Sequence, residues 1–331
     1  MGKRLSWIDQ AKGLALALVV LGHLGIPYIG QYYTTIHLPL FFFLSGVTFS
    51  VKHDFGTFLR GKIKRLIIPY FCLGIPLVLS SIVSRIRDGI VDSGAYWELV
   101  FNFFTQTRMY TIWFLTCLFL TSIMLYVLIK IVKDHLGKVL VISLIFSIIG
   151  AIYWEMGGIE LPWNFDACFV AILFMALGYC VNKKGYLDDK KYFNSWIIFV
   201  SASLIYIACV TINGFVIHEK FDMALRHCGA APLSFLGIIS GIYCVAFFLK
   251  RFSIGGIIEY FGKNTMVYFA WHQSIILPIL FWLYGLLGWF AQDTIFWDAC
   301  RSVLTFVLIF VLLYPFDLLF RKTRLKFAIG K

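Results

Sequence analysis

The strongest constraint on the fold is the recurrence of long apolar runs along the chain. Ten segments are each about the 20 residues that an α-helix needs to cross a hydrocarbon core of about 30 Å. They cover approximately residues 5–25, 32–51, 66–84, 110–131, 139–154, 165–182, 193–212, 232–249, 265–285 and 302–320. Strands of a membrane barrel would alternate apolar and polar residues, whereas these runs are continuously apolar. The pattern predicts an all-α fold, a polytopic transmembrane helix bundle of about ten spans.

The composition argues against a separate soluble domain. Of the 331 residues, 60% are hydrophobic and 14% are charged, whereas about a quarter of the residues of a soluble domain are charged. No polar stretch approaches the roughly 50 residues of a small domain. We therefore expect one integral-membrane domain over residues 1–331. Lys12 interrupts the first apolar run and no small-residue cleavage site follows, so we expect an uncleaved first span rather than a signal peptide.

The distribution of basic residues predicts the orientation. Of the 29 Lys and Arg residues, 22 lie in alternate segments between the spans, counted from the N-terminus, and six lie in the other loops. Because cytoplasmic loops are enriched in Lys and Arg, this alternation predicts that both termini are cytoplasmic. The net charge of +12 then reflects membrane topology, and we expect no nucleic-acid partner.

The first span carries three ionisable side chains. Lys12 and His23 are 11 residues apart, which places them on one face of an α-helix and about 16 Å apart along its axis. Asp9 lies one turn before Lys12, within reach of an ion pair. Ionisable groups within a membrane commonly mark a pathway or a functional site. In the alternative interpretation, Lys12 extends to the inner interface beside Asp9, and His23 is an interfacial histidine.

Two further groups of polar residues stand at the ends of spans. His37 enters the second span at a depth that could match that of His23. Lys62, Lys64 and Arg65 form a basic cluster at the cytoplasmic end of the third span. This cluster suits either the phosphates of a cytosolic ligand or an anchor at an anionic lipid surface.

Several kinds of site are not indicated. The chain has no zinc-protease, serine-hydrolase or P-loop motif, and its eight cysteines show no metal-ligand spacing. We expect no metal. Cys228 and Cys300 lie in or beside predicted outer loops, where a disulfide is one possibility.

A series of motifs carries a family resemblance. In order along the chain they are IDQAKGLALALVVLGH, IHLPLFFFLSG, KIKRLIIPYF, IWFLTCLF, LPWNFDACFVAILFMALGY and FGKNTMVYFAWHQS. The series resembles the integral-membrane acyltransferase-3 family, and within it the sugar O-acetylases that act on Nod factors and bacterial surface polysaccharides. Lys12 and His23 match the family's basic residue, ten intervening residues and histidine. Lys62-x-x-Arg65 resembles the second basic motif of the family. In each of the two motifs, this chain has Lys at the first position, where Arg is more usual.

The resemblance implies an acyltransferase in the bacterial cytoplasmic (inner) membrane. It would move an acetyl group from cytosolic acetyl-CoA to a hydroxyl of a surface polysaccharide, lipid-linked sugar or related glycoconjugate. Lys12, Lys62, Lys64 and Arg65 would then bind the phosphates of CoA, with Asp9 supporting Lys12. His23 would act as the base that deprotonates the acceptor hydroxyl, or would form a transient acetyl-His intermediate.

Other residues are candidates for supporting roles. Asp166 or Glu155 could orient His23, or could be ordinary polar residues near the outer ends of their spans. His37 and His272 could take part in the chemistry, and Trp113 could stack on a sugar ring or belong to the interfacial belt.

Two other function classes stay open at this level. The first is a transporter or flippase for a sugar or lipid-linked sugar, and the second is a membrane subunit that only binds partners. The chain lacks the repeated halves and matching broken helices that are common in transporters, which favours the enzyme. Apart from membrane lipid, the expected partners are acyl-CoA and a carbohydrate acceptor.

Overall fold

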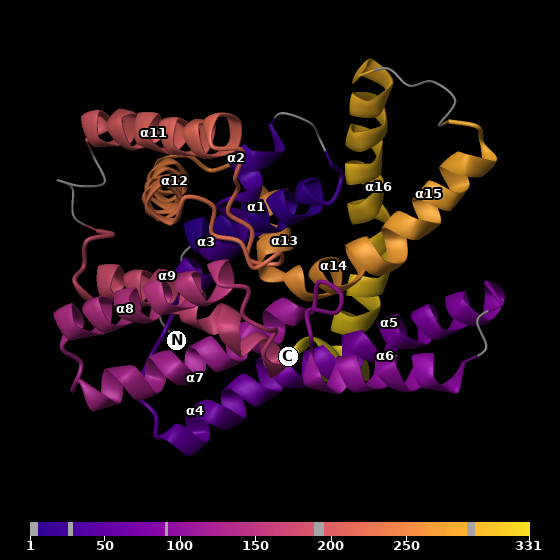
Figure 1. Cartoon of the computed structure of the whole chain (residues 1–331), viewed down its shortest axis with the longest axis horizontal. Helices are drawn as coiled ribbons and strands as arrows, with labels where there is room; N and C mark the ends of the chain where they lie inside the picture. Colours follow the sequence, from indigo (N-terminus) through magenta and orange to yellow (C-terminus); the bar gives the residue numbers. More distant parts are fainter. Residues whose placement is uncertain (1–5, 26–28, 90–91, 189–194, 290–294) are drawn as a thin grey trace.

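The computed structural model describes residues 6–25, 29–89, 92–188, 195–289 and 295–331 (Figure 1). Over these residues the secondary structure is helical, apart from one isolated bridge between Asp222 and His227. The prediction of an all-α fold is confirmed. The helices are α1 (Ser6–Gly22), α2 (Gly30–Thr34), α3 (His37–Val47), α4 (Phe55–Lys62), η1 (Ile63–Ile67), α5 (Ile68–Arg87), α6 (Ser93–Thr105), α7 (Trp113–Ile131), α8 (Leu136–Glu155), η2 (Pro162–Asn164), α9 (Phe165–Lys183), α11 (Trp196–Thr211), η3 (Ile212–Val216), α12 (Ala231–Arg251), α13 (Gly256–Lys263), α14 (Thr265–Trp271), η4 (His272–Ile276), α15 (Leu277–Leu286), α16 (Ile295–Lys322) and η5 (Arg324–Ile329).

Each predicted span contains a helix or a helical segment, although the span over residues 32–51 is divided between the end of α2 and the short helix α3. Among the described residues, eight such segments are long and apolar enough to cross a membrane. The two remaining helices are shorter, with 17 residues in α1 and 11 in α3. At 1.5 Å per residue these helices are about 25 Å and 16 Å long. The number of ten crossings and the cytoplasmic termini therefore remain predictions.

Three helices lie in segments that were expected to be loops: α4, α6 and α13. The first of them begins after Asp54, whose carboxylate accepts a hydrogen bond from the Thr57 amide at 3.0 Å. Such a cap satisfies a free N–H group of the first helical turn. Through the π-helical turn η1, α4 continues into α5, so the chain is helical from Phe55 to Arg87.

Helix α1 lies at the centre of the bundle (Figure 1). It contacts α3, α12, α13 and α14, and α3 in turn packs on α9. In the view of Figure 1, the pair α11 and α12 lies on one side of α1, and α5, α6 and α7 lie on the other. The polar face of α1 is therefore enclosed by helices from distant parts of the sequence.

Glycines allow α13 to approach α1 closely. A Cβ atom on Gly262 would lie 1.6 Å from the carbonyl oxygen of Asp9, and one on Gly13 would lie 2.0 Å from that of Ile258. Only residues without a side chain fit at such distances, as is common where membrane helices pack. The contact holds the end of α13, with Lys263, against the first turns of α1.

Candidate active site

Two cavities lie along α1. The basic cavity has a volume of about 270 Å³ and is lined by Lys12, Phe41, Ser45, Arg65, Leu66, Phe114, Leu115, Leu118, Gly262, Lys263, Asn264, Thr265, Met266, Phe269, Asp317, Ile329, Gly330 and Lys331. The histidine cavity has a volume of about 660 Å³ and is lined by Val19, Gly22, His23, Thr34, His37, Leu38, Arg108, Tyr110, Thr111, Trp113, Asp222, Ala224, Leu225, Phe269, Gln273 and Ser274. Phe269 lines both cavities, so they meet at this residue.

Four cations from four segments line the basic cavity. Lys12 comes from α1, Arg65 from the π-helical turn η1, Lys263 from the end of α13, and Lys331 from the residues after η5. The Lys331 ammonium donates a hydrogen bond to Asn264 Oδ1 at 2.6 Å. Among the described lining residues, Asp317 has the one side-chain carboxylate. This excess of positive charge favours a polyanionic ligand.

The three members of the basic cluster at the third span, Lys62, Lys64 and Arg65, have different surroundings in the structure. Arg65 lines the basic cavity, whereas Lys64 is exposed outside it. The Lys62 ammonium donates to Ser122 Oγ of α7 at 3.0 Å and lies 5.3 Å from the Phe49 ring centre. The charges of Lys12 and Arg65 both act on Lys62, so these three cations are neighbours. Asp9 is buried one turn before Lys12.

Three histidines gather at the other end of α1. His23 follows the last turn of α1, is exposed to the histidine cavity, and its ring centre lies 5.1 Å from that of His272. His37, the first residue of α3, lines the same cavity, and its buried Nδ1 has no hydrogen-bond partner among the described residues. The sequence places these three histidines in three different spans, and the structure brings them together at this end of α1.

The hydrogen bonds of His272 define its tautomer. Its Nδ1 lies 2.9 Å from the carbonyl oxygen of Tyr268 and 3.0 Å from that of Phe269. Because carbonyl oxygens only accept, Nδ1 carries the hydrogen and Nε2 of the neutral ring is an acceptor. This Nε2 is buried and makes no hydrogen bond to the described residues. His272 can therefore accept a hydrogen bond beside His23.

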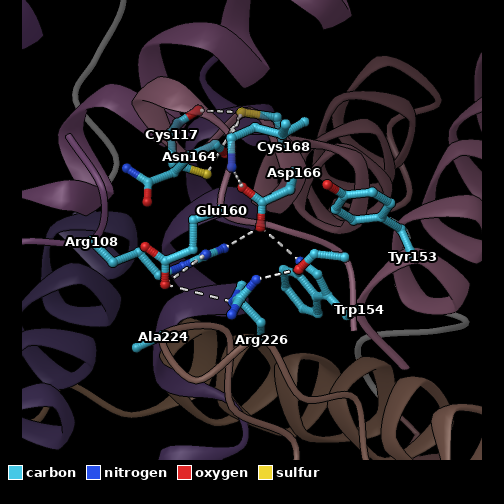
Figure 2. A network of polar contacts seen from close by, with 12 residues as sticks. Arg108, Cys117, Tyr153, Trp154, Glu160, Asn164, Asp166, Cys168, Ala224 and Arg226 are labelled. Atoms are coloured by element: carbon cyan, nitrogen blue, oxygen red, sulfur yellow. Dashed lines mark hydrogen bonds and ion pairs between the residues drawn. The ribbon is translucent and has the colours of Figure 1, made fainter. Parts of the chain in front are cut away.

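A buried ionic network borders the histidine cavity (Figure 2). Arg108 Nη2 lies 2.5 Å from Asp166 Oδ2, and the same carboxylate accepts hydrogen bonds from Trp154 Nε1 at 2.8 Å and from the Leu161 amide at 3.2 Å. Figure 2 shows Arg108 and Arg226 converging on Glu160, whose Oε1 lies 3.7 Å from the first guanidinium and 3.6 Å from the second. The network joins the segments before α7, α9 and α12.

The Nε donor of Arg108 takes no part in this network, and its Nη1 lies 3.7 Å from Glu160 Oε1, too far for a hydrogen bond. The Arg108 side chain is 5% exposed, and its Nε and Nη1 atoms are buried without a hydrogen-bond partner among the described residues. Leaving a buried donor unsatisfied costs about 1–3 kcal/mol. Since Arg108 also lines the histidine cavity, its guanidinium can donate to a ligand there.

The structure does not bring the two candidate orienting carboxylates to His23. Asp166 binds Arg108, and Glu155 accepts a hydrogen bond from the Cys228 amide at 3.2 Å and lies 3.4 Å from the His227 imidazole. Neither is among the described residues that line the histidine cavity.

The remaining candidates are placed as follows. Trp113 does line the histidine cavity, but it is 5% exposed and the Arg108 guanidinium lies 5.8 Å from its ring centre. Cys228 is buried, Cys300 is exposed, and both are free thiols.

Sequence reasoning missed four residues that line the cavities: Arg108, Asp222, Lys263 and Lys331. Arg108 is one of only six basic residues in the loops that are poor in Lys and Arg, and this rarity was a usable signal. The other three come together only through packing between segments that are far apart in the sequence.

Comparison with known proteins identifies the family. The family model of the acyltransferase domain called acyltransferase 3 matches residues 5–314, nearly the whole chain. A search of curated proteins and a search of solved structures each found no match. The match contains every motif of the sequence series and all described lining residues of both cavities except Asp317 and residues 329–331. The chain therefore belongs to the acyltransferase-3 family and is a membrane acyltransferase.

Proposed function

We propose that the protein is an O-acetyltransferase that moves an acetyl group from acetyl-CoA to a sugar hydroxyl of a surface polysaccharide or lipid-linked glycan. The observation that carries this proposal is the pair of cavities that share Phe269, one lined by four cations and the other by histidines. An acyl transfer between two compartments needs a donor site, an acceptor site and a route between them. Membership of an acyltransferase family favours this function over transport without covalent chemistry.

The basic cavity suits the phosphates of CoA. Lys12, Arg65, Lys263 and Lys331 supply the cations, and the arginine can bind a phosphate with two parallel hydrogen bonds. The volume of about 270 Å³ is below the roughly 300–1,000 Å³ of pockets that enclose a drug-sized ligand. We therefore expect only part of CoA to enter, with the nucleotide at the mouth and the pantetheine arm directed toward Phe269.

The histidine cavity suits the chemical step. Transfer forms a bond between the acceptor oxygen and the acetyl carbonyl carbon, and breaks the bond from that carbon to sulfur. His23 takes the proton of the attacking hydroxyl and then gives it to the departing thiolate, which is the work of a general base and acid near neutral pH. Direct transfer is the simpler route, because Ser274, the one serine among the described lining residues, makes no hydrogen bond to a histidine there, and no cysteine is among these residues.

The acceptor contacts follow from the free donors and acceptors of the same cavity. Arg108 lines the cavity and offers N–H groups to acceptor oxygens, whereas His272, whose Nε2 is buried, is not among the described lining residues. Gln273 and Ser274 supply further polar groups beside them. Such a mixture of donors and acceptors suits a polyhydroxylated ligand better than an apolar one.

The test is acetyl transfer by the purified protein in lipid nanodiscs. We expect radiolabelled acetyl-CoA to label a sugar acceptor, and His23→Ala to lower kcat at least about 100-fold, because general acid–base catalysis contributes about 10²–10⁴-fold. Binding of CoA by calorimetry should survive in His23→Ala and weaken in Arg65→Ala.

The matched control is His53→Ala, since His53 is exposed on the loop before α4 and lines neither cavity. Undiminished transfer by His23→Ala would rule out this mechanism. Acid quenching during turnover distinguishes the two routes, because label that remains on the protein in wild type and disappears in His23→Ala would indicate an acetyl-His intermediate instead of direct transfer.

A further inference from the structure

The loop of residues 217–230, between η3 and α12, brings a carboxylate to the histidine cavity. Asp222 lines this cavity with His23 and His37, and its negative charge acts on both imidazoles. It is the sole carboxylate among the described lining residues.

The Asp222 side chain is fixed by its own loop. Its Oδ1 accepts hydrogen bonds from the amides of Ala224 at 2.9 Å and Leu225 at 3.1 Å. Its backbone exchanges two hydrogen bonds with that of His227, at 2.8 and 3.0 Å. Asp residues commonly hold turns in this way. Both amide contacts use one oxygen, which leaves Oδ2 to accept a hydrogen bond from another group.

The loop is itself fastened to the body of the protein. Arg226 pairs with Glu160 and donates to the Gly158 carbonyl oxygen, and the Cys228 amide donates to Glu155. Figure 2 shows Arg226 and Ala224 at the edge of the network that contains Arg108. A site residue held by such a supporting shell keeps its geometry during turnover.

The other ionisable groups around His23 are neutral or positive. Its neighbours are His37 from α3, His272 from η4 and Arg108 from the segment before α7. None of these groups is negative, so none stabilises a second positive charge. A nearby anion favours the imidazolium form of a general base, and Asp222 is the one carboxylate among the described residues that line this cavity.

We propose that Asp222 is a positioning residue that acts on His23 through its negative charge and stabilises the imidazolium that forms during acyl transfer. This inference rests on the proposed function, in which His23 takes the hydroxyl proton. Asp222 forms and breaks no covalent bond. The proton moves from the acceptor hydroxyl to His23 and then to the CoA thiolate, while the acyl carbon exchanges sulfur for oxygen.

The test is Asp222→Asn in the transfer assay with acetyl-CoA and the sugar acceptor. Asparagine keeps the Oδ1 that binds the two loop amides, so the loop fold is retained, but the negative charge is lost. We expect kcat to fall about 10- to 1,000-fold with the KM for acetyl-CoA unchanged. The acid limb of the kcat/KM profile should move to lower pH, because the charged imidazole is no longer favoured. Asp222→Glu should recover part of kcat.

Glu219→Gln is the matched control, since Glu219 is a carboxylate on the same loop that pairs with His227 and does not line the histidine cavity. It should leave kcat and the pH profile unchanged. If Asp222→Asn retains wild-type kcat and pH profile while His23→Ala is inactive, the inference is overturned and the proposed function stands. If His23→Ala is fully active, the proposed function fails and the inference fails with it.

Discussion

At the scale of single residues, Arg108 and Asp166 form the most buried ion pair in the described part of the chain, with side chains 5% and 0% exposed. Removing one partner of a buried pair leaves an uncompensated charge and costs about 3–5 kcal/mol. We therefore expect Arg108→Leu to lower the unfolding temperature strongly, as measured by intrinsic tryptophan fluorescence in detergent.

The double variant Arg108→Leu/Asp166→Leu separates folding from acceptor binding. Replacing both charges by apolar groups should recover most of the stability, because no unpaired charge remains. The KM for the sugar acceptor should nevertheless stay raised, because the Arg108 guanidinium that lines the histidine cavity is absent. A double variant with wild-type acceptor KM would show that Arg108 is purely structural.

At the scale of elements, the contact between α13 and α1 controls the basic cavity. Gly262→Ala would place a Cβ atom 1.6 Å from the Asp9 carbonyl oxygen, so α13 must move away from α1 and carry Lys263 with it. We expect the KM for acetyl-CoA to rise at least severalfold and the unfolding temperature to fall.

Gly256→Ala is the control on the same helix, because no atom lies within 4 Å of a Cβ at this position. Alanine is favoured over glycine in helices by about 1 kcal/mol, so this variant should be neutral or slightly stabilised. Equal kinetics for the two alanine variants would contradict the importance of the close helix contact.

The sequence predicts the apolar helices well and the short polar ones poorly. Hydropathy is a local property, so the runs that became α7, α9 and α12 can be recognised without knowing what packs against them. Helix α13 is short and lies between two spans, and its position depends on the contact of Gly262 with α1. The interruption of the 265–285 span by the π-helical turn at His272 also leaves no clear local signal.

At the scale of the whole molecule, each cavity combines residues that are far apart in the chain. The spacing of Lys12 and His23 predicts that the two ends of α1 differ in chemistry, because both residues lie on one helix. The contributions of Lys331 and Asp222 depend instead on how η5 and the 217–230 loop fold back onto the bundle. Such long-range packing is not encoded in any local pattern, which is why these residues were missed.

The predicted orientation can be tested with a membrane-impermeant maleimide on intact cells. Cys300 is exposed and lies beside a predicted outer loop, so it should be labelled from outside. Burial raises the pKa of the Cys228 thiol to about 12, so this residue should stay protonated and react slowly. In a Cys300→Ser background, Lys52→Cys should react only after permeabilisation. Labelling of Lys52→Cys in intact cells would reverse the orientation.

The phenylalanines where the two cavities meet bear on whether ions can leak through the protein. Phe41, Phe114 and Phe269 contact one another, with ring centres 5.3 to 6.3 Å apart, where the basic and histidine cavities meet. A water-filled channel through the protein would dissipate the membrane potential, which is worth about 2.3 kcal/mol per elementary charge at 100 mV. If the pantetheine arm of CoA displaces one of these rings, the arm itself fills the opening between the two cavities. Under the proposed function, the donor substrate would then close the passage while it occupies it, and acetyl transfer would proceed without a leak of ions.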